Sequence, residues 1–98
     1  MSQPTPATWP VVQLPGSLSL VLPAFNEEAN IEAVVQDSLA TLPAFADSYE
    51  IIVVDDGSRD GTSTLVEAIS RRDARVKLVR HPQNRGYGAA LRSGFRAT

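Results

Sequence analysis

Residues 51–54 form an unbroken apolar run that strongly restricts the folds available to this chain. Four consecutive β-branched residues, Ile51 to Val54, are followed directly by Asp55 and Asp56. Branched side chains favour strands, and a strand that is apolar on both faces is typical of the interior of a parallel sheet covered by helices. The run therefore predicts a central strand, residues 49–54, that ends on two carboxylates.

Two further strands are predicted on either side of this one in the sequence. An apolar run from Leu18 is closed by Pro23, so the first strand is expected to end near Leu22. Residues 75–80, RVKLVR, predict the third strand.

Three helices are expected between and after these strands. The first has Asn26 as its expected N-cap and ends at Pro43. Its apolar residues recur at helical spacing, at Ile31, Val34, Val35, Leu39 and Leu42. The second helix is capped by Asp60 or Thr62, and the third begins near Gly88.

The order β-α-β-α-β-α predicts an α/β fold of three layers, in which right-handed crossovers build a parallel sheet between helices. Ligands of such sheets bind beyond the carboxyl ends of the strands. Asp55 and Asp56 are therefore expected at a ligand crevice, beside the sequence PAFNE at residues 23–27. A three-stranded sheet with two open edges is expected to self-associate or to belong to a longer protein.

Residues 1–16 differ in composition from the rest of the chain. They contain four of its seven prolines, which remove backbone donors and favour extended, unpaired conformations. We interpret residues 1–16 as a flexible leader and residues 17–98 as the folded unit. The alternative is that the leader covers the open sheet surfaces through Trp9, Val11 and Val12.

Composition weighs against several functions. The net charge of -2 is not that of a nucleic-acid-binding domain. The absence of cysteine excludes disulfides and thiolate metal sites and fits a cytoplasmic location. The apolar runs are far shorter than the ~20 residues of a membrane-spanning helix. Neither a G-x-G-x-x-G dinucleotide motif nor a P-loop is present.

Asp55 and Asp56 are expected to have different roles, because consecutive side chains of a strand face opposite sides of the sheet. A shared metal ion is therefore not expected. One carboxylate faces the crevice and the other holds the turn that contains Gly57. A bacterial receiver domain, the alternative, also ends a strand in paired acids. It needs a further phosphate-accepting aspartate, whereas the next strand here is followed by His81 and Pro82.

Three segments carry a resemblance to a known family. They are LVLPAFNEEANI at residues 20–31, EIIVVDDGSRDGT at 50–62 and NRGYGAALRSGF at 84–95. In this order and spacing they resemble the N-terminal part of family 2 glycosyltransferases, most closely the dolichol-phosphate mannosyltransferase-like, polyprenyl-phosphate sugar transferases. The resemblance covers about residues 18–98.

The resemblance implies a GT-A fold with a Rossmann-like nucleotide-binding half, a GDP- or UDP-sugar donor and an inverting transfer. It also implies a divalent ion, Mg or Mn, and an acceptor such as a polyprenyl phosphate at the cytoplasmic face of the membrane. The metal ligands and catalytic residues of the family would follow Thr98. We therefore expect no catalytic residue, no metal ligand and no transferase activity in this chain by itself, and a homo-oligomer is possible.

The resemblance also assigns the nucleoside to a set of residues, namely Pro23, Phe25, Glu27, Val54 and Asp56. The residue types agree with that role. Pro23 and Phe25 offer rigid apolar surface to a flat base, and the carboxylates of Glu27 and Asp56 can accept hydrogen bonds from base N–H groups and ribose hydroxyls. Asp55 is expected to hold the turn.

The loop before the third helix supplies further candidates. Arg85 either binds a diphosphate through its planar guanidinium or is a solvated loop cation. Gly86 and Gly88 either let the backbone approach a ligand or form the turn. His81 is expected to be structural. Tyr87 and Phe95 are expected to pack in the core.

Overall fold

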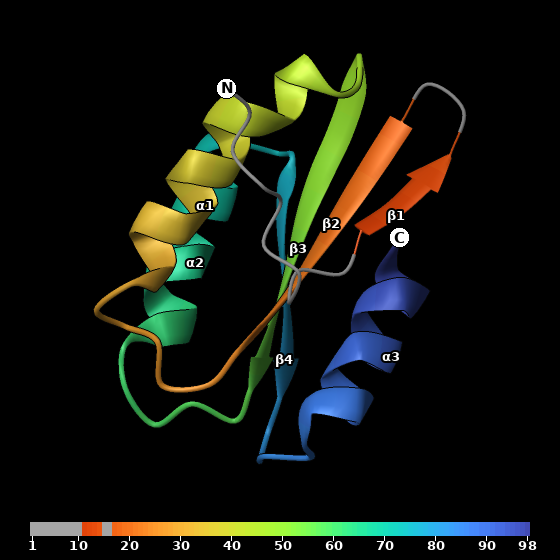
Figure 1. Cartoon of the computed structure of the whole chain (residues 1–98). Coiled ribbons are helices and arrows are strands. Elements are labelled where there is room, and N and C mark those ends of the chain that lie inside the picture. The colour runs from red at the N-terminus through yellow and green to blue at the C-terminus, as the bar shows by residue number, and fades with distance from the viewer. Residues whose placement is uncertain (1–10, 15–16) are drawn as a thin grey trace.

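A four-stranded sheet lies between two helical layers (Figure 1). The computed structural model describes residues 11–14 and 17–98. The strands are β1 (Val11–Leu14), β2 (Ser17–Ala24), β3 (Ser48–Asp56) and β4 (Val76–His81), and the helices are α1 (Ile31–Thr41), α2 (Thr62–Arg72) and α3 (Tyr87–Ala97), with a short 3-10 turn, η1, at Leu42–Ala44. The predicted order of alternating strands and helices is confirmed from β2 onward.

The sheet has the order β1-β2-β3-β4, with β2, β3 and β4 parallel. The apolar run therefore lies in a central strand, as predicted. Across the sheet from β4 to β2, the third, second and first parallel strands of the chain follow one another. This is the strand order of half a dinucleotide-binding fold. A receiver-like fold would place the first parallel strand between the second and the third. The register aligns Asp56 with His81 on the neighbouring strand.

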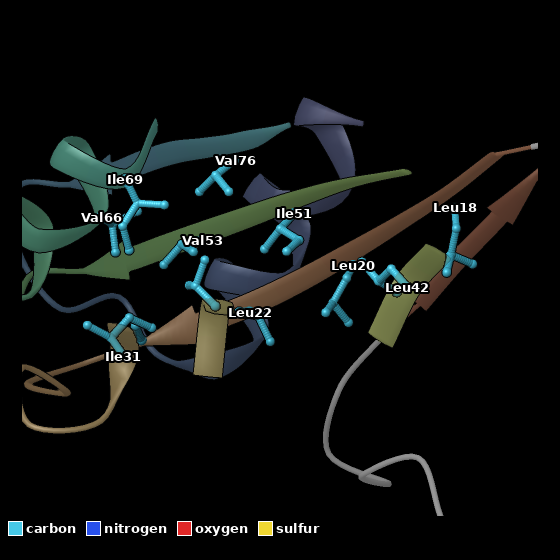
Figure 2. Packing of buried hydrophobic residues seen from close by; sticks show 12 residues of the cluster. Leu18, Leu20, Leu22, Ile31, Leu42, Ile51, Val53, Val66, Ile69 and Val76 are labelled. Carbon is cyan, nitrogen blue, oxygen red and sulfur yellow. The ribbon is translucent and has the colours of Figure 1, made fainter. Parts of the chain in front are cut away.

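Alternation along β3 divides the core into two clusters. Ile51 and Val53 belong to the larger cluster, which packs against α1 and α2. Figure 2 shows Val53 beside Leu22 of β2 and Val66 of α2, with Ile51 farther along β3. Ile52 and Val54 belong to the smaller cluster on the other face, under α3, with Val21 and Ala90. All four apolar residues of the run are fully buried.

Strand β1 corrects the expectation of a three-stranded sheet. It pairs antiparallel with the amino half of β2, from Val11 opposite Leu20 to Leu14 opposite Ser17. Part of the proposed leader therefore forms an edge strand. Trp9 lies outside the described residues. Within residues 11–14 and 17–98, nothing pairs with the outer edge of β4 or with that of the carboxyl half of β2.

Three boundary predictions were wrong. Helix α2 has Gly61 at its N-cap, without a side-chain cap, instead of Asp60 or Thr62. The other two have identifiable reasons. Asn26 does not cap α1, which starts at Ile31. The Asn26 backbone has a φ of 53°, and its side-chain Oδ1 accepts the N–H of Arg59 in the loop after β3 instead. Strand β2 continues through Pro23 to Ala24. A proline can lie in this strand because the neighbouring edge of β2 is unpaired there among the described residues.

Helix α3 lies close to the sheet because its inward face is made of small residues, Ala90 and Gly94. A Cβ at Gly94 would lie 2.3 Å from Cγ1 of Val21 and 3.2 Å from Cγ2 of Val54. This leaves no room for aromatic rings beneath the helix. Tyr87 and Phe95 are accordingly 58% and 42% exposed, which corrects the prediction that they pack in the core. No helix in the described part of the chain is long and apolar enough to cross a bilayer.

Replacement of Gly94 tests this close packing. We expect Gly94→Ala to destabilise the fold by about 1–3 kcal/mol, because the added methyl group must displace α3 or the buried valines. The matched control is Gly88→Ala on the exposed side of α3, where the new Cβ meets only the end of Arg92 at 3.5 Å. That change is expected to stabilise by up to about 1 kcal/mol. Urea unfolding measures both, and equal effects would contradict the packing of α3.

Candidate functional site

Three loops meet at the carboxyl end of the parallel strands, the lower edge of the sheet in Figure 1. They are residues 25–30 after β2, residues 57–61 after β3 and residues 82–86 after β4. Each loop contains part of one of the three sequence segments described above, 20–31, 50–62 and 84–95. The edge is therefore the place where the quoted motifs come together.

The first two loops are held together by side-chain to backbone hydrogen bonds. The backbone N–H of Asn26 donates to Ser58 Oγ at 2.8 Å, and that of Arg59 donates to Asn26 Oδ1 at 2.9 Å. The N–H of Glu27 donates to Thr62 Oγ1 at 2.9 Å. The Glu27 side chain makes no hydrogen bond to the residues that the structure describes, and it is exposed at the edge.

Glu28 and Asp60 continue this contact between the loops. The N–H of Glu28 donates to Asp60 Oδ2 at 3.2 Å, and the N–H of Gly61 donates to Glu28 Oε1. Hydrogen bonds from Thr62 lower the pKa of Asp60. Gly61 allows the approach, since a Cβ there would lie 2.6 Å from Glu28 Oε1. The second acid of the NEE sequence is thus structural.

Asp55 faces α1 and α2 and closes the turn after β3. Its Oδ1 accepts the N–H of Ser58 at 3.0 Å, and only 2% of the residue is exposed. The turn needs Gly57, which has a φ of 80°. A Cβ at Gly57 would lie 2.4 Å from the backbone nitrogen of Asn84, so the loop after β4 packs directly on this turn.

Asp56 faces α3 and binds the loop after β4. Its Oδ1 accepts the N–H of Arg85 at 2.9 Å and contacts His81 Nδ1 at 2.8 Å, while Oδ2 accepts the N–H of Gly86 at 2.9 Å. Burial raises the pKa of Asp56, but the hydrogen bonds from His81, Arg85 and Gly86 lower it more, so it lies below 3.8. The carboxylate is therefore ionised at neutral pH.

His81 was expected to be structural, and the structure shows what it contacts. The residue ends β4, is 7% exposed and places Nε2 2.7 Å from Ser93 Oγ on α3. The sequence analysis missed Ser93 and placed His81 in a loop. The parallel register, which aligns Asp56 with His81, could have suggested the pairing.

The predicted nucleoside residues differ in their accessibility. Phe25 is 45% exposed and Pro23 is half-buried, so both present surface at the edge. Val54 is fully buried beneath α3, and its contact with a nucleoside remains a prediction. Asp56 is 5% exposed and already accepts three hydrogen bonds, so its carboxylate has capacity for about one more. Its contact with a base remains a prediction.

Two features of the site remain, namely the Arg85 side chain and the capacity of the described residues to bind a metal ion. The Arg85 side chain is exposed and has no ion-pair partner among residues 11–14 and 17–98, while its backbone is fixed by Asp56. The same residues contain no group of three or more His, Cys, Asp or Glu side chains that could hold a metal ion. The donor set described here therefore does not fit a divalent cation.

This edge belongs to a nucleotide-binding type of α/β fold, and the comparisons with known proteins identify the family. The family model described as Glycosyl transferase family 2 matches residues 19–98, and the chain belongs to that family. The chain is similar to polyprenyl-phosphate sugar transferases. It is 37% identical over 87 residues to the human (Homo sapiens) dolichyl-phosphate beta-glucosyltransferase, covering 80% of this chain and 26% of the relative.

Two further relatives agree. An undecaprenyl-phosphate 4-deoxy-4-formamido-L-arabinose transferase of Aeromonas hydrophila is 39% identical over 84 residues, covering 80% of this chain and 24% of the relative. The structure of a Pyrobaculum calidifontis mannosyltransferase in complex with GDP-Man and Mn2+ superposes with a TM-score of 0.71 at 27% identity, covering 92% of this chain and 27% of that one. The fold is thus that of a GT-A glycosyltransferase, and the chain spans about a quarter of the length of these relatives.

The two aspartates are expected to differ in their contribution to stability. Asp56→Asn replaces a charged acceptor of several hydrogen bonds and should lower the free energy of unfolding by about 1.5–3 kcal/mol. Asp55→Asn is the matched control, because an amide oxygen can still accept the N–H of Ser58; it should cost about 1 kcal/mol or less. Urea unfolding at pH 7 measures both, and a larger loss in Asp55→Asn would contradict the assignment.

The effect of Asp56 should also depend on pH. Because its pKa is lower in the folded than in the unfolded chain, its stabilisation is complete above the ordinary value of 3.8 and is lost as pH falls through the folded pKa. The difference in unfolding free energy between the wild type and Asp56→Asn should therefore shrink below about pH 4. A difference that stays constant down to about pH 2 would show that the charge of Asp56 is not involved.

Proposed function

We propose that this chain is the nucleotide-binding part of a glycosyltransferase that takes a sugar from a GDP- or UDP-sugar and transfers it, with inversion, to a polyprenyl phosphate. The relatives named above support the acceptor class, since their names specify dolichyl and undecaprenyl phosphates. The similar mannosyltransferase structure, which contains GDP-Man and Mn2+, supports a nucleotide-sugar donor. The activity is proposed for a protein of the relatives' length.

The observation that carries the proposal is the position of the carboxyl edge of the sheet relative to the winding of the chain. Helices α1 and α2 cover one face of the sheet, and α3 covers the other (Figure 1). A helix on the opposite face after β4 is the arrangement of a doubly wound sheet whose winding reverses there, and this supports a switch point beside the first parallel strand, β2. Nucleotides bind at such switch points in doubly wound sheets. Phe25, at the end of β2, is exposed at this point.

The residues at the edge divide into two groups according to their chemistry. Phe25 and Pro23 provide an apolar surface for the base, and the carboxylate of Glu27 can accept hydrogen bonds from the base or the ribose. Arg85 provides a planar cation for the diphosphate. We propose binding and orientation of the donor as the role of these residues.

The metal and the catalytic groups are proposed to lie in the part of the relatives' length that this chain does not span. Mg or Mn is expected there, because the mannosyltransferase structure contains Mn2+ and the residues described here do not form a cation site. No step of the reaction is assigned to the metal. The proposed location is the cytoplasmic face of a membrane, where a polyprenyl phosphate would present its headgroup, and self-association remains a proposal.

Replacement of Phe25 tests the nucleotide site. We expect Phe25→Ala to weaken the binding of GDP or UDP about fivefold to a hundredfold, because stacking of a base on an aromatic ring contributes about 1–3 kcal/mol. The matched control is Phe45→Ala. Phe45 is 62% exposed but lies between α1 and β3, at the opposite edge of the sheet. Isothermal titration of both nucleotides measures the affinities.

The outcomes separate clearly. Loss of affinity in Phe25→Ala with no change in Phe45→Ala supports the site. Equal loss in both variants would show a general effect of losing an exposed ring, and a wild-type chain that binds neither GDP nor UDP would contradict the proposed function.

A further inference from the structure

Three side chains form a buried hydrogen-bonded chain that the proposed binding of the donor does not use. Asp56 of β3, His81 of β4 and Ser93 of α3 are linked by contacts of 2.8 Å and 2.7 Å. Asp56 and His81 are 5% and 7% exposed. The ionised Asp56 can only accept a hydrogen bond, so His81 Nδ1 donates to it, and His81 Nε2 shares a hydrogen bond with the hydroxyl of Ser93.

The order of these groups is that of a serine hydrolase triad, but the surroundings do not fit that chemistry. Ser93 lies inside α3, which runs from Tyr87 to Ala97. The backbone N–H groups of Ser93 and Gly94 are therefore used by bonds within the helix and cannot stabilise an oxyanion. These two groups therefore form no oxyanion hole at Ser93, and we assign the three residues a role in positioning other groups.

What the three residues position is the loop before α3. Asp56 accepts the N–H groups of Arg85 and Gly86, the last two residues before the helix. Gly86 has a φ of 94°, a conformation that directs the chain into α3 at Tyr87. The Asp56 carboxylate therefore fixes the position of the Arg85 backbone and the point at which α3 begins.

The start of α3 and Arg85 are suited to the same kind of ligand. The first N–H groups of a helix have no partners within the helix and favour anions, and Arg85 is an exposed cation beside them. His81 itself is buried, but it holds the carboxylate that holds this loop.

We propose that His81 is a positioning residue that, through Asp56, keeps Arg85 and the start of α3 in the arrangement that receives the diphosphate of the donor. This inference rests on the proposed function for the identity of the ligand. The contact between His81 and Asp56 is independent of that identity, and the experiment has one arm for each.

The first arm measures amide hydrogen exchange at Arg85 and Gly86. Exchange at both should become about tenfold or more faster in His81→Leu, which removes a charge-assisted hydrogen bond to Asp56. His81→Asn is the conservative variant, because its amide can still donate to Asp56 from nearly the position of Nδ1, and it should exchange almost as slowly as the wild type. Ser93→Ala, which removes the partner of Nε2, should have a smaller effect in the direction of His81→Leu.

The second arm compares ligands with and without phosphates. His81→Leu should bind GDP or UDP about tenfold more weakly than the wild type, while its affinity for guanosine or uridine should fall less. His81→Asn should restore diphosphate binding. A general loss of structure would instead weaken the binding of both the nucleotide and its nucleoside. The comparison therefore distinguishes positioning from simple destabilisation.

Each outcome decides the inference. Unchanged exchange at Arg85 and Gly86 in His81→Leu overturns it, as does equal loss of nucleoside and diphosphate binding. If the wild type binds neither GDP nor UDP, the proposed function fails, and the exchange arm alone decides whether His81 positions the loop. If His81→Leu does not fold, exchange in Ser93→Ala that equals the wild type overturns the inference, and faster exchange restricted to Arg85 and Gly86 supports it.

Discussion

The alternation of side chains at the end of β3 is the constraint on which the site depends. Asp55 and Asp56 are consecutive, so they face opposite layers, and each carboxylate accepts backbone N–H groups from the loop on its side. A chain can end a buried apolar strand on two charges because both are satisfied at once. The free energy of desolvating them is offset by hydrogen bonds from groups that would otherwise lack partners.

The same arrangement explains how hydrogen bonds between the loops build the edge. Asn26, Glu28 and Asp60 join the loops after β2 and β3, and Asp56 with His81 joins the loop after β4 to α3. Much of the motif sequence is therefore needed for the framework. The groups proposed to bind the donor are exposed, namely the ring of Phe25, the carboxylate of Glu27 and the guanidinium of Arg85. A rigid framework that presents a few groups is the arrangement expected of a preorganised binding site.

The parallel sheet, its central strand and the family could be predicted, because the apolar run and the three spaced motifs are patterns visible in the sequence itself. The role of Asp56 was not, since its partners are the backbone of Arg85 and Gly86 and the ring of His81, which lie 25 or more residues away. The exposure of Tyr87 and Phe95 also depends on tertiary structure, because the small face of α3 lies too close to the sheet to cover them. Strand β1 was not predicted, because the prolines around it suggested an unpaired leader.

The central claim is that the charge of Asp56 is used to hold the loop before α3. Titration of the Asp56 carboxyl carbon by 13C NMR tests it directly, with the amide protons of Arg85 and Gly86 followed in the same samples. The account predicts a pKa below the ordinary 3.8 and amide shifts of both residues that follow the same midpoint. A pKa at or above 3.8, with amide signals that do not respond, would contradict it.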